Sequence, residues 1–142
     1  MINEDREKTT KDWGMRFLDL LQQRPFAMLE PERRTEGREE VLEANKLISP
    51  FGKAAVNVYL ECRVKQQDIT VTLILSHQGL LNGEKKLPFL FRIAHIVESG
   101  VSNWFLIDVN EGSHRRIDIR EAVDKVHSKF NQTLEEMTNV TL

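Results

Sequence analysis

The stretch from Val56 to Leu75, VNVYLECRVKQQDITVTLIL, decides the fold class. Apolar residues take every second position, the even numbers from Val56 to Val64 and then the odd numbers from Ile69 to Leu75. Because successive side chains of a strand point to opposite faces, this period of two is typical of half-buried antiparallel strands. A two-residue turn at 66–67, or a four-residue loop with the same register, joins them. Both connections pair apolar residues with each other: Val64 with Ile69, Cys62 with Val71, Leu60 with Leu73, and Val58 with Leu75.

A second hairpin is predicted between residues 89 and 109. A three-residue loop, 98–100, is a favoured connection because Gly100 supplies a left-handed residue. The resulting pairs are Val97 with Val101, His95 with Asn103, Ile93 with Phe105, Phe91 with Ile107, and Phe89 with Val109. The hairpins then join with Leu75 beside Phe89 and Ile69 beside His95, which keeps Arg92 off the apolar face. We therefore expect a four-stranded antiparallel meander.

Two helices are predicted before this sheet. Residues 1–8 are expected to be frayed, and the first helix begins at Thr9 or Thr10 as N-cap and ends before Pro25. Its apolar face carries Trp13, Phe17, Leu20 and Leu21. The second helix is amphipathic over residues 41–48 and ends at Pro50. The charged segment before residue 41 is either a loop or solvated helix face, or an acidic-basic docking surface.

A final helix has the clearest pattern. Asp118 can cap it, and Glu121 stands three residues later in a capping-box arrangement. One apolar stripe follows along about five turns: Ile119, Val123, Val126, Phe130, Leu134 and Met137. The sequence thus predicts a single α+β domain over residues 1–142, with two N-terminal helices, a four-stranded antiparallel meander and a long C-terminal helix packed on one sheet face.

Composition restricts the function classes. With 40% hydrophobic and 30% charged residues and a net charge of -2, the chain has ordinary globular usage and no global basic field. The one cysteine, Cys62, excludes an internal disulfide and a cysteine-based zinc cluster. The N-terminus is charged and lacks the apolar segment of a secretion signal, and no apolar run is long enough to span a membrane. We therefore expect a soluble cytoplasmic protein without a membrane partner.

No catalytic signature is present. The sequence lacks the common nucleophile-elbow, phosphate-loop, dinucleotide and zinc-protease strings. Cys62 lies mid-strand with no lysine or histidine on its own face, which predicts a small core residue and not a nucleophile. His77 and His95 both continue apolar alternations, but the expected register separates them by roughly 26 Å, too far to share a metal. We therefore expect no enzymatic activity, no cofactor and no metal.

Three groups of residues are candidate sites. His95 and Asn103 form a polar pair that is either hydrogen-bonded at the sheet rim or part of a small polar pocket. The outer sheet face carries an apolar patch with an aromatic ring and an arginine, the composition of a binding hot spot: Leu90, Arg92, Ala94, Ile96, Trp104 and Leu106. The alternative is that Trp13 and Phe17 of the first helix cover this face. A basic rim precedes the last helix, at His114, Arg115 and Arg116.

Two function classes follow. The first is a non-catalytic protein-interaction module, such as an adaptor, chaperone-like protein or regulatory subunit, that binds a protein partner or pairs as a homodimer through the outer face or an edge strand formed by residues 101–109. The alternative is a nucleic-acid-binding sheet on which Trp104 and the arginines at 92, 115 and 116 converge. A phosphate cradle at the last helix is disfavoured, because Asp118 and Glu121 already occupy its N-terminus.

Overall fold

One helix, a seven-stranded antiparallel sheet and a second helix follow each other along the chain. The computed structural model describes residues 2–24, 31–48, 55–77 and 85–139. The elements are α1 (Ile2–Gln22), β1 (Glu32–Glu36), β2 (Glu39–Ile48), β3 (Val56–Val64), β4 (Asp68–His77), β5 (Lys85–Glu98), β6 (Val101–Asp108), β7 (Ser113–Arg116) and α2 (Ile119–Asn139). The strands neighbour each other in sequence order from β1 to β7. The expected α+β class, with an antiparallel sheet followed by a C-terminal helix, is therefore confirmed, but the expected two N-terminal helices and four-stranded meander are wrong.

The expected second helix is the β1–β2 hairpin. Gly37 has a φ of 60° in the turn, a conformation that glycine adopts without strain. On one face of β2, Leu42 and Ala44 pair with the core strand β3. The alternation of apolar and polar residues is interrupted in the sequence because Val41, on the other face, is also apolar and fully buried. Pairing with β3 thus overrides a local pattern that resembles an amphipathic helix.

Two further elements differ from expectation. Helix α1 begins at Ile2, so most of the segment expected to be frayed is helical, and Thr10 lies inside the helix. Strand β7 pairs with β6 where only a connection was expected. The prolines at 25 and 50, expected to end two helices, lie outside the described residues.

The register of the first predicted hairpin is confirmed. Strands β3 and β4 pair Val64 with Ile69 and continue residue by residue as expected. Between β4 and β5, Ile69 faces Ile93 instead of His95, a shift of two residues. Since a shift of two leaves every side chain on its face, the apolar face of β5 stays inward.

The register of the second predicted hairpin is wrong by one residue. The β5–β6 turn has two residues, Ser99 and Gly100, with φ values of 51° and 76°. Positive φ at both central residues is the type I′ geometry that matches the twist of a hairpin. His95 consequently pairs with Trp104 instead of Asn103. A one-residue slip exchanges the two faces of β6.

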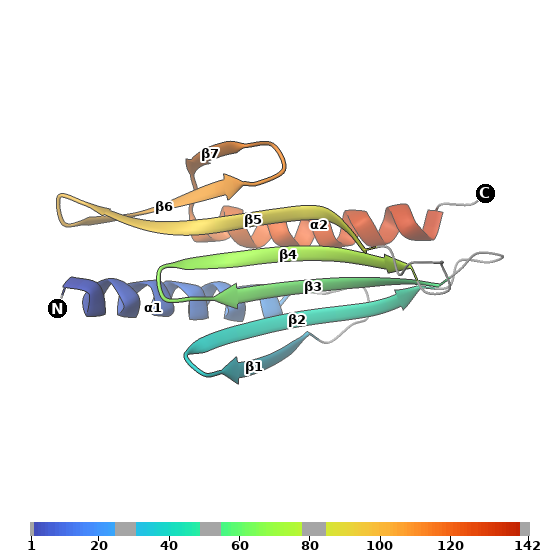
Figure 1. The fold of residues 1–142 in the computed structure, drawn as a ribbon, viewed down its shortest axis with the longest axis horizontal. Coiled ribbons are helices and arrows are strands. Elements are labelled where there is room, and N and C mark those ends of the chain that lie inside the picture. The colour runs from blue at the N-terminus through green and yellow to red at the C-terminus, as the bar shows by residue number, and fades with distance from the viewer. Residues whose placement is uncertain (1, 25–30, 49–54, 78–84, 140–142) are drawn as a thin grey trace.

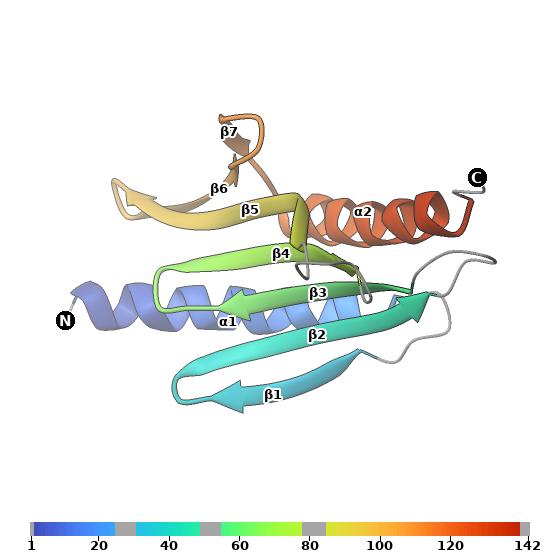
Figure 2. The same cartoon turned by 45° about the vertical axis from the view of Figure 1, so that its right-hand side comes forward.

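Both helices pack on the same face of the sheet (Figure 1). Seen from a second direction, β6 and β7 turn out of the plane of the other strands, while α1 and α2 stay on their common side (Figure 2). The core between the layers includes Phe17 of α1, Cys62 of β3 and Phe130 of α2, all fully buried. Cys62 is therefore confirmed as a core residue, and burial raises the pKa of its thiol. Among the described residues, neither helix is long and apolar enough to cross a membrane.

The C-terminal helix follows its predicted pattern. Asp118 Oδ1 accepts the backbone N–H of Glu121 at 2.8 Å, which is the expected cap. The inward stripe is buried at Val123, Val126, Phe130 and Leu134. The Met137 side chain falls outside the described part of the chain.

Helix α1 approaches the sheet closely at one glycine. A Cβ atom at Gly14 would lie 2.5 Å from Cγ1 of Val64, well inside van der Waals contact. Valine is stiff at χ1, so its methyl groups cannot swing away freely. The absence of a side chain at Gly14 therefore sets the distance between α1 and β3.

Substitution of this glycine tests the helix–sheet packing. An ordinary helical Gly→Ala change stabilises by about 1 kcal/mol, but overpacking costs about 1–3 kcal/mol. We expect Gly14→Ala to lower the free energy of unfolding in urea, and Val64→Ala to reduce that loss in the double variant. Lys11→Ala, on the exposed side of α1, is the control and should change stability by less than about 0.5 kcal/mol. A stabilised Gly14→Ala protein would contradict the close contact.

Candidate functional site

Trp104 lies on the inner face, in a stack of four aromatic rings. Its ring centroid is 4.2 Å from that of His95 and 4.3 Å from that of Trp13, with interplanar angles of 14° and 16°. Trp13 stacks in turn on Phe17 at 5.8 Å. The stack ties α1 to strands β5 and β6. Trp104 was expected on the outer face as a partner-binding residue, and this placement is wrong because its ring faces inward. Leu106, which is only 3% exposed, also lies on the inner face.

His95 is the polar end of this stack. Its Nδ1 lies 2.9 Å from the Thr10 hydroxyl and its Nε2 lies 2.8 Å from the Ser102 hydroxyl. Thr10 donates its own hydrogen to the Arg6 carbonyl at 2.8 Å, so it accepts from Nδ1–H. The neutral ring then accepts the Ser102 hydrogen at Nε2. His95 therefore has both nitrogens satisfied.

The predicted pairing of His95 with Asn103 is wrong. Asn103 stands opposite Ile96 on the outer face. The residues that do bond His95 are Thr10, from a distant helix, and Ser102, its diagonal neighbour. The Ser99-Gly100 pair was the one signal in the sequence that could have revealed this, because it fits a two-residue turn.

The environment of His95 disfavours its protonated form. Burial of the ring and the nearby positive charge of Arg6 lower the pKa of His95 from its usual 6.5. Arg6 is held in place because its Nη2 donates to the His95 carbonyl at 2.6 Å. The folded protein thus binds a proton at His95 less readily than the unfolded chain does.

This difference predicts a pH dependence of stability. The contribution of neutral His95 is complete above pH 6.5 and is lost as pH falls from 6.5 toward its lower folded-state pKa, since the unfolded chain then binds more protons. We expect the urea-unfolding free energy to decline through this range in the parent protein and to decline less in His95→Asn. His114→Asn, at an exposed strand position, is the matched control. Identical pH profiles for the parent and His95→Asn would contradict the account.

The outer face of β5 and β6 has a different apolar surface from the one expected. Because the register exchanges the faces of β6, Phe105 and Ile107 point outward opposite Ala94 and Arg92. The outer apolar patch, as defined here, comprises Leu90, Ala94, Ile96, Phe105 and Ile107. Ile96 is 38% exposed, and the nearby Val101 at the hairpin tip is 59% exposed.

Arginines border this patch. Arg116 of β7 lies over the Phe105 ring, with its Cζ 6.0 Å from the centroid, a cation–π geometry. Arg92, half exposed, pairs with Asp68 at 2.7 Å. Arg115, on the other side of β7, binds Glu121 at 2.9 Å. The expected basic rim at residues 114–116 is therefore an exposed strand whose arginines have separate partners.

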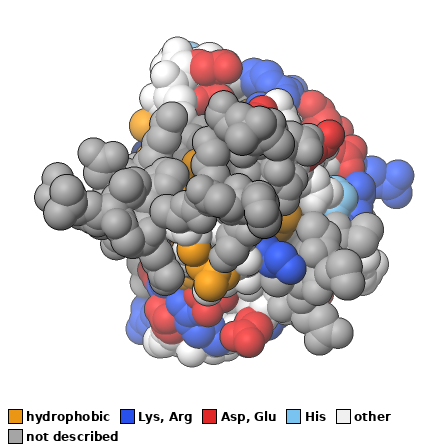
Figure 3. Space-filling model, turned by 90° about the vertical axis from the view of Figure 1, so that its right-hand side faces the viewer, with side chains coloured by type: hydrophobic (Ala, Val, Ile, Leu, Met, Phe, Trp, Pro, Cys, Tyr) orange, Lys and Arg blue, Asp and Glu red, His pale blue; other side chains and the backbone are white. Residues whose placement is uncertain are grey.

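The β1–β3 end of the outer face is polar and internally paired. Arg63 contacts three carboxylates, of Glu36, Glu39 and Glu61, at 2.7–2.9 Å. The Tyr59 hydroxyl lies 2.5 Å from Glu43 Oε2, and this hydrogen bond, followed by that of Arg34, lowers the pKa of Glu43. At the end of the molecule where α2 finishes, acidic and basic side chains lie next to one another wherever described side chains are visible (Figure 3). The charged side chains of this part of the sheet therefore pair with one another.

The sheet edges are short and charged. Strand β1 reads ERRTE and strand β7 reads SHRR, and all four residues of β7 are exposed. Short charged edges discourage the addition of another strand. Strand β6, expected to be an edge, is covered by β7. The outer face is thus a better contact surface than either edge.

Comparison of the chain with protein-family models, with curated proteins and with solved structures finds no match. Within the described part of the chain, no group of three or more histidine, cysteine, aspartate or glutamate residues could hold a metal ion. The His77 side chain lies outside that part.

Proposed function

We propose that this chain is a non-catalytic protein-interaction module that binds a protein partner, or a second copy of itself, through the outer apolar patch. The observation that carries the proposal is the arrangement of the layers. Both helices lie on the inner face, and no described element lies over the outer face of β5 and β6 (Figures 1 and 2). A cytoplasmic setting is part of the proposal and rests on composition alone.

The chemistry of the patch supports this function. Phe105, Ile107 and Ile96 supply aromatic and aliphatic area, and Arg116 and Arg92 stand beside them. Aromatic residues and arginine are the types enriched at the centre of protein interfaces. The exposed valine at the hairpin tip extends the apolar surface beyond β4. When a partner removes this apolar surface from water, the free energy of the complex falls.

The nucleic-acid alternative has less support. It needed Trp104 beside the arginines, but Trp104 stacks between Trp13 and His95. Arg115 is engaged with Glu121. Among the described residues on the outer face of β5 and β6, the aromatic ring is Phe105, and it already lies under Arg116. The residues on the outer face of β5 and β6 therefore fit protein binding better than nucleic-acid binding.

A charge placed in the patch tests the proposal. Ile96→Glu should leave the fold intact, because the side chain is exposed, and should weaken self-association or partner capture at least tenfold. Self-association is measured by light scattering after gel filtration, and capture by pull-down from an extract of the organism that makes the protein. Binding of single-stranded DNA by the parent protein at 0.2 M salt would favour the alternative instead.

Leu47→Glu is the matched control. Leu47 lies on the same sheet face, is 53% exposed and belongs to β2, far from the patch. It should leave mass and partner capture unchanged. Equal effects of the two substitutions, or no effect of Ile96→Glu on a complex that the parent protein forms, would contradict the proposal.

A further inference from the structure

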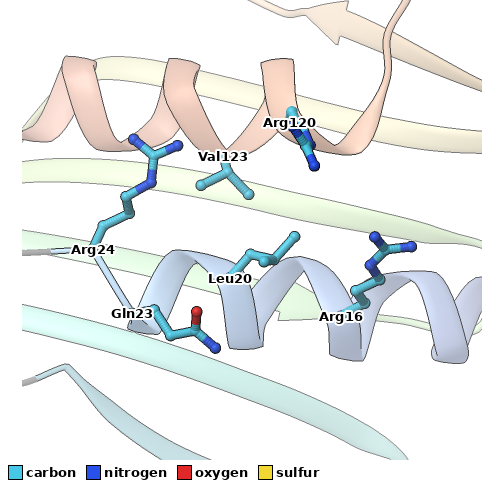
Figure 4. A pocket seen from close by; sticks show the side chains of 6 residues that line it. All are labelled: Arg16, Leu20, Gln23, Arg24, Arg120 and Val123. Carbon is cyan, nitrogen blue, oxygen red and sulfur yellow. The ribbon is translucent and has the colours of Figure 1, made fainter.

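A basic groove runs between α1 and α2, on the side of the molecule away from the outer apolar patch. It is a cavity of about 370 Å³ lined by Arg16, Leu20, Gln23, Arg24, Arg120 and Val123. Figure 4 shows the side chains of Arg16 and Arg120 extending into the gap from opposite helices. Leu20 and Val123 point toward each other between the two helices. The groove therefore combines an apolar floor with cationic walls.

The carboxylates near the groove pair with arginines other than Arg16 and Arg120, and one of these, Arg24, itself lines the groove. Asp124 pairs with Arg24 at 2.5 Å, and Asp19 pairs with Arg33 at 2.7 Å. Glu121 pairs with Arg115. Within the described residues, no salt bridge or hydrogen bond from a side chain joins Arg16 or Arg120 to a partner. Of the three arginines that line the groove, Arg24 is therefore neutralised by Asp124, while Arg16 and Arg120 have no anionic partner among the described residues.

The two arginines call for a particular ligand chemistry. A guanidinium group presents its N–H donors in a planar fork that matches phosphate and carboxylate oxygens, and such charge-assisted bonds are the strong ones. Two unpaired positive charges are neutralised by a phosphate monoester, which carries nearly two negative charges at pH 7. A monocarboxylate would leave one of the two positive charges without a counter-charge. The apolar floor adds a surface for a ring or alkyl group on the same molecule.

We propose that the groove between α1 and α2 binds a small organic phosphate monoester. Its phosphate lies between Arg16 and Arg120, and its apolar part lies on Leu20 and Val123. The volume suits a small ligand, since ligand pockets begin at about 300 Å³. The site does not use the N-terminus of α2, where Asp118 already accepts a backbone N–H. It is independent of the proposed protein-binding face.

Phenyl phosphate is the probe, and calorimetry or amide chemical shifts measure its binding. We expect a Kd on the order of 1 mM or tighter, as a ligand of this size allows. Benzoate, with one charge, and inorganic phosphate, without a ring, should each bind at least fivefold more weakly. The shifted amides should cluster at residues 16–24 and 119–124.

Substitution of the two arginines tests whether the ligand binds in this groove. Arg16→Gln and Arg120→Gln, both at exposed positions, should each weaken phenyl phosphate binding about tenfold without loss of thermal stability. Arg38→Gln is the matched control, because it removes the same charge from an exposed arginine in the β1–β2 turn. Absence of binding by the parent protein would overturn the proposal. Equal weakening by Arg38→Gln would also overturn it, since binding would then follow net charge alone.

Discussion

The two-residue turn at Ser99-Gly100 is the constraint on which the arrangement of surfaces depends. Positive φ at both positions closes the β5–β6 hairpin as a type I′ turn and sets His95 opposite Trp104. Since strand side chains alternate, this register sends Trp104 inward and Phe105 outward. A loop longer by one residue would exchange them and bury the surface that we assign to a partner.

The inward residues in turn position α1. Trp104 stacks between His95 and Trp13, and aromatic pairs of this kind each contribute about 0.5–1.5 kcal/mol beyond the area they bury. Two polar contacts from α1 add to this: Arg6 donates to the His95 carbonyl, and Thr10 accepts from the ring. With Gly14 against Val64, these contacts hold the helix along the inner face. Helix α1 then forms one wall of the basic groove, so the same register supports both proposed sites, one on each face.

The sequence allowed correct prediction where local pattern and tertiary structure agree. Strands β3 and β4 alternate strictly, so their register followed from the residues, and the cap at Asp118 marked the start of α2. The β1–β2 hairpin could not be predicted by periodicity, because Val41 is buried on the face opposite Leu42. The β5–β6 register could not be read from alternation either, since residues 104–107 are apolar without interruption and fit both phases. The interhelical groove joins residues about a hundred positions apart, which no short motif marks.

Both proposed surfaces depend on the pairing of β5 with β6, which nuclear Overhauser effects measure directly in the isotope-labelled protein. We expect cross-strand contacts between His95 and Trp104, together with ring contacts from Trp104 to Trp13 and none from Phe105 to α1. Cross-strand contacts between His95 and Asn103, with the Phe105 ring against α1, would contradict it.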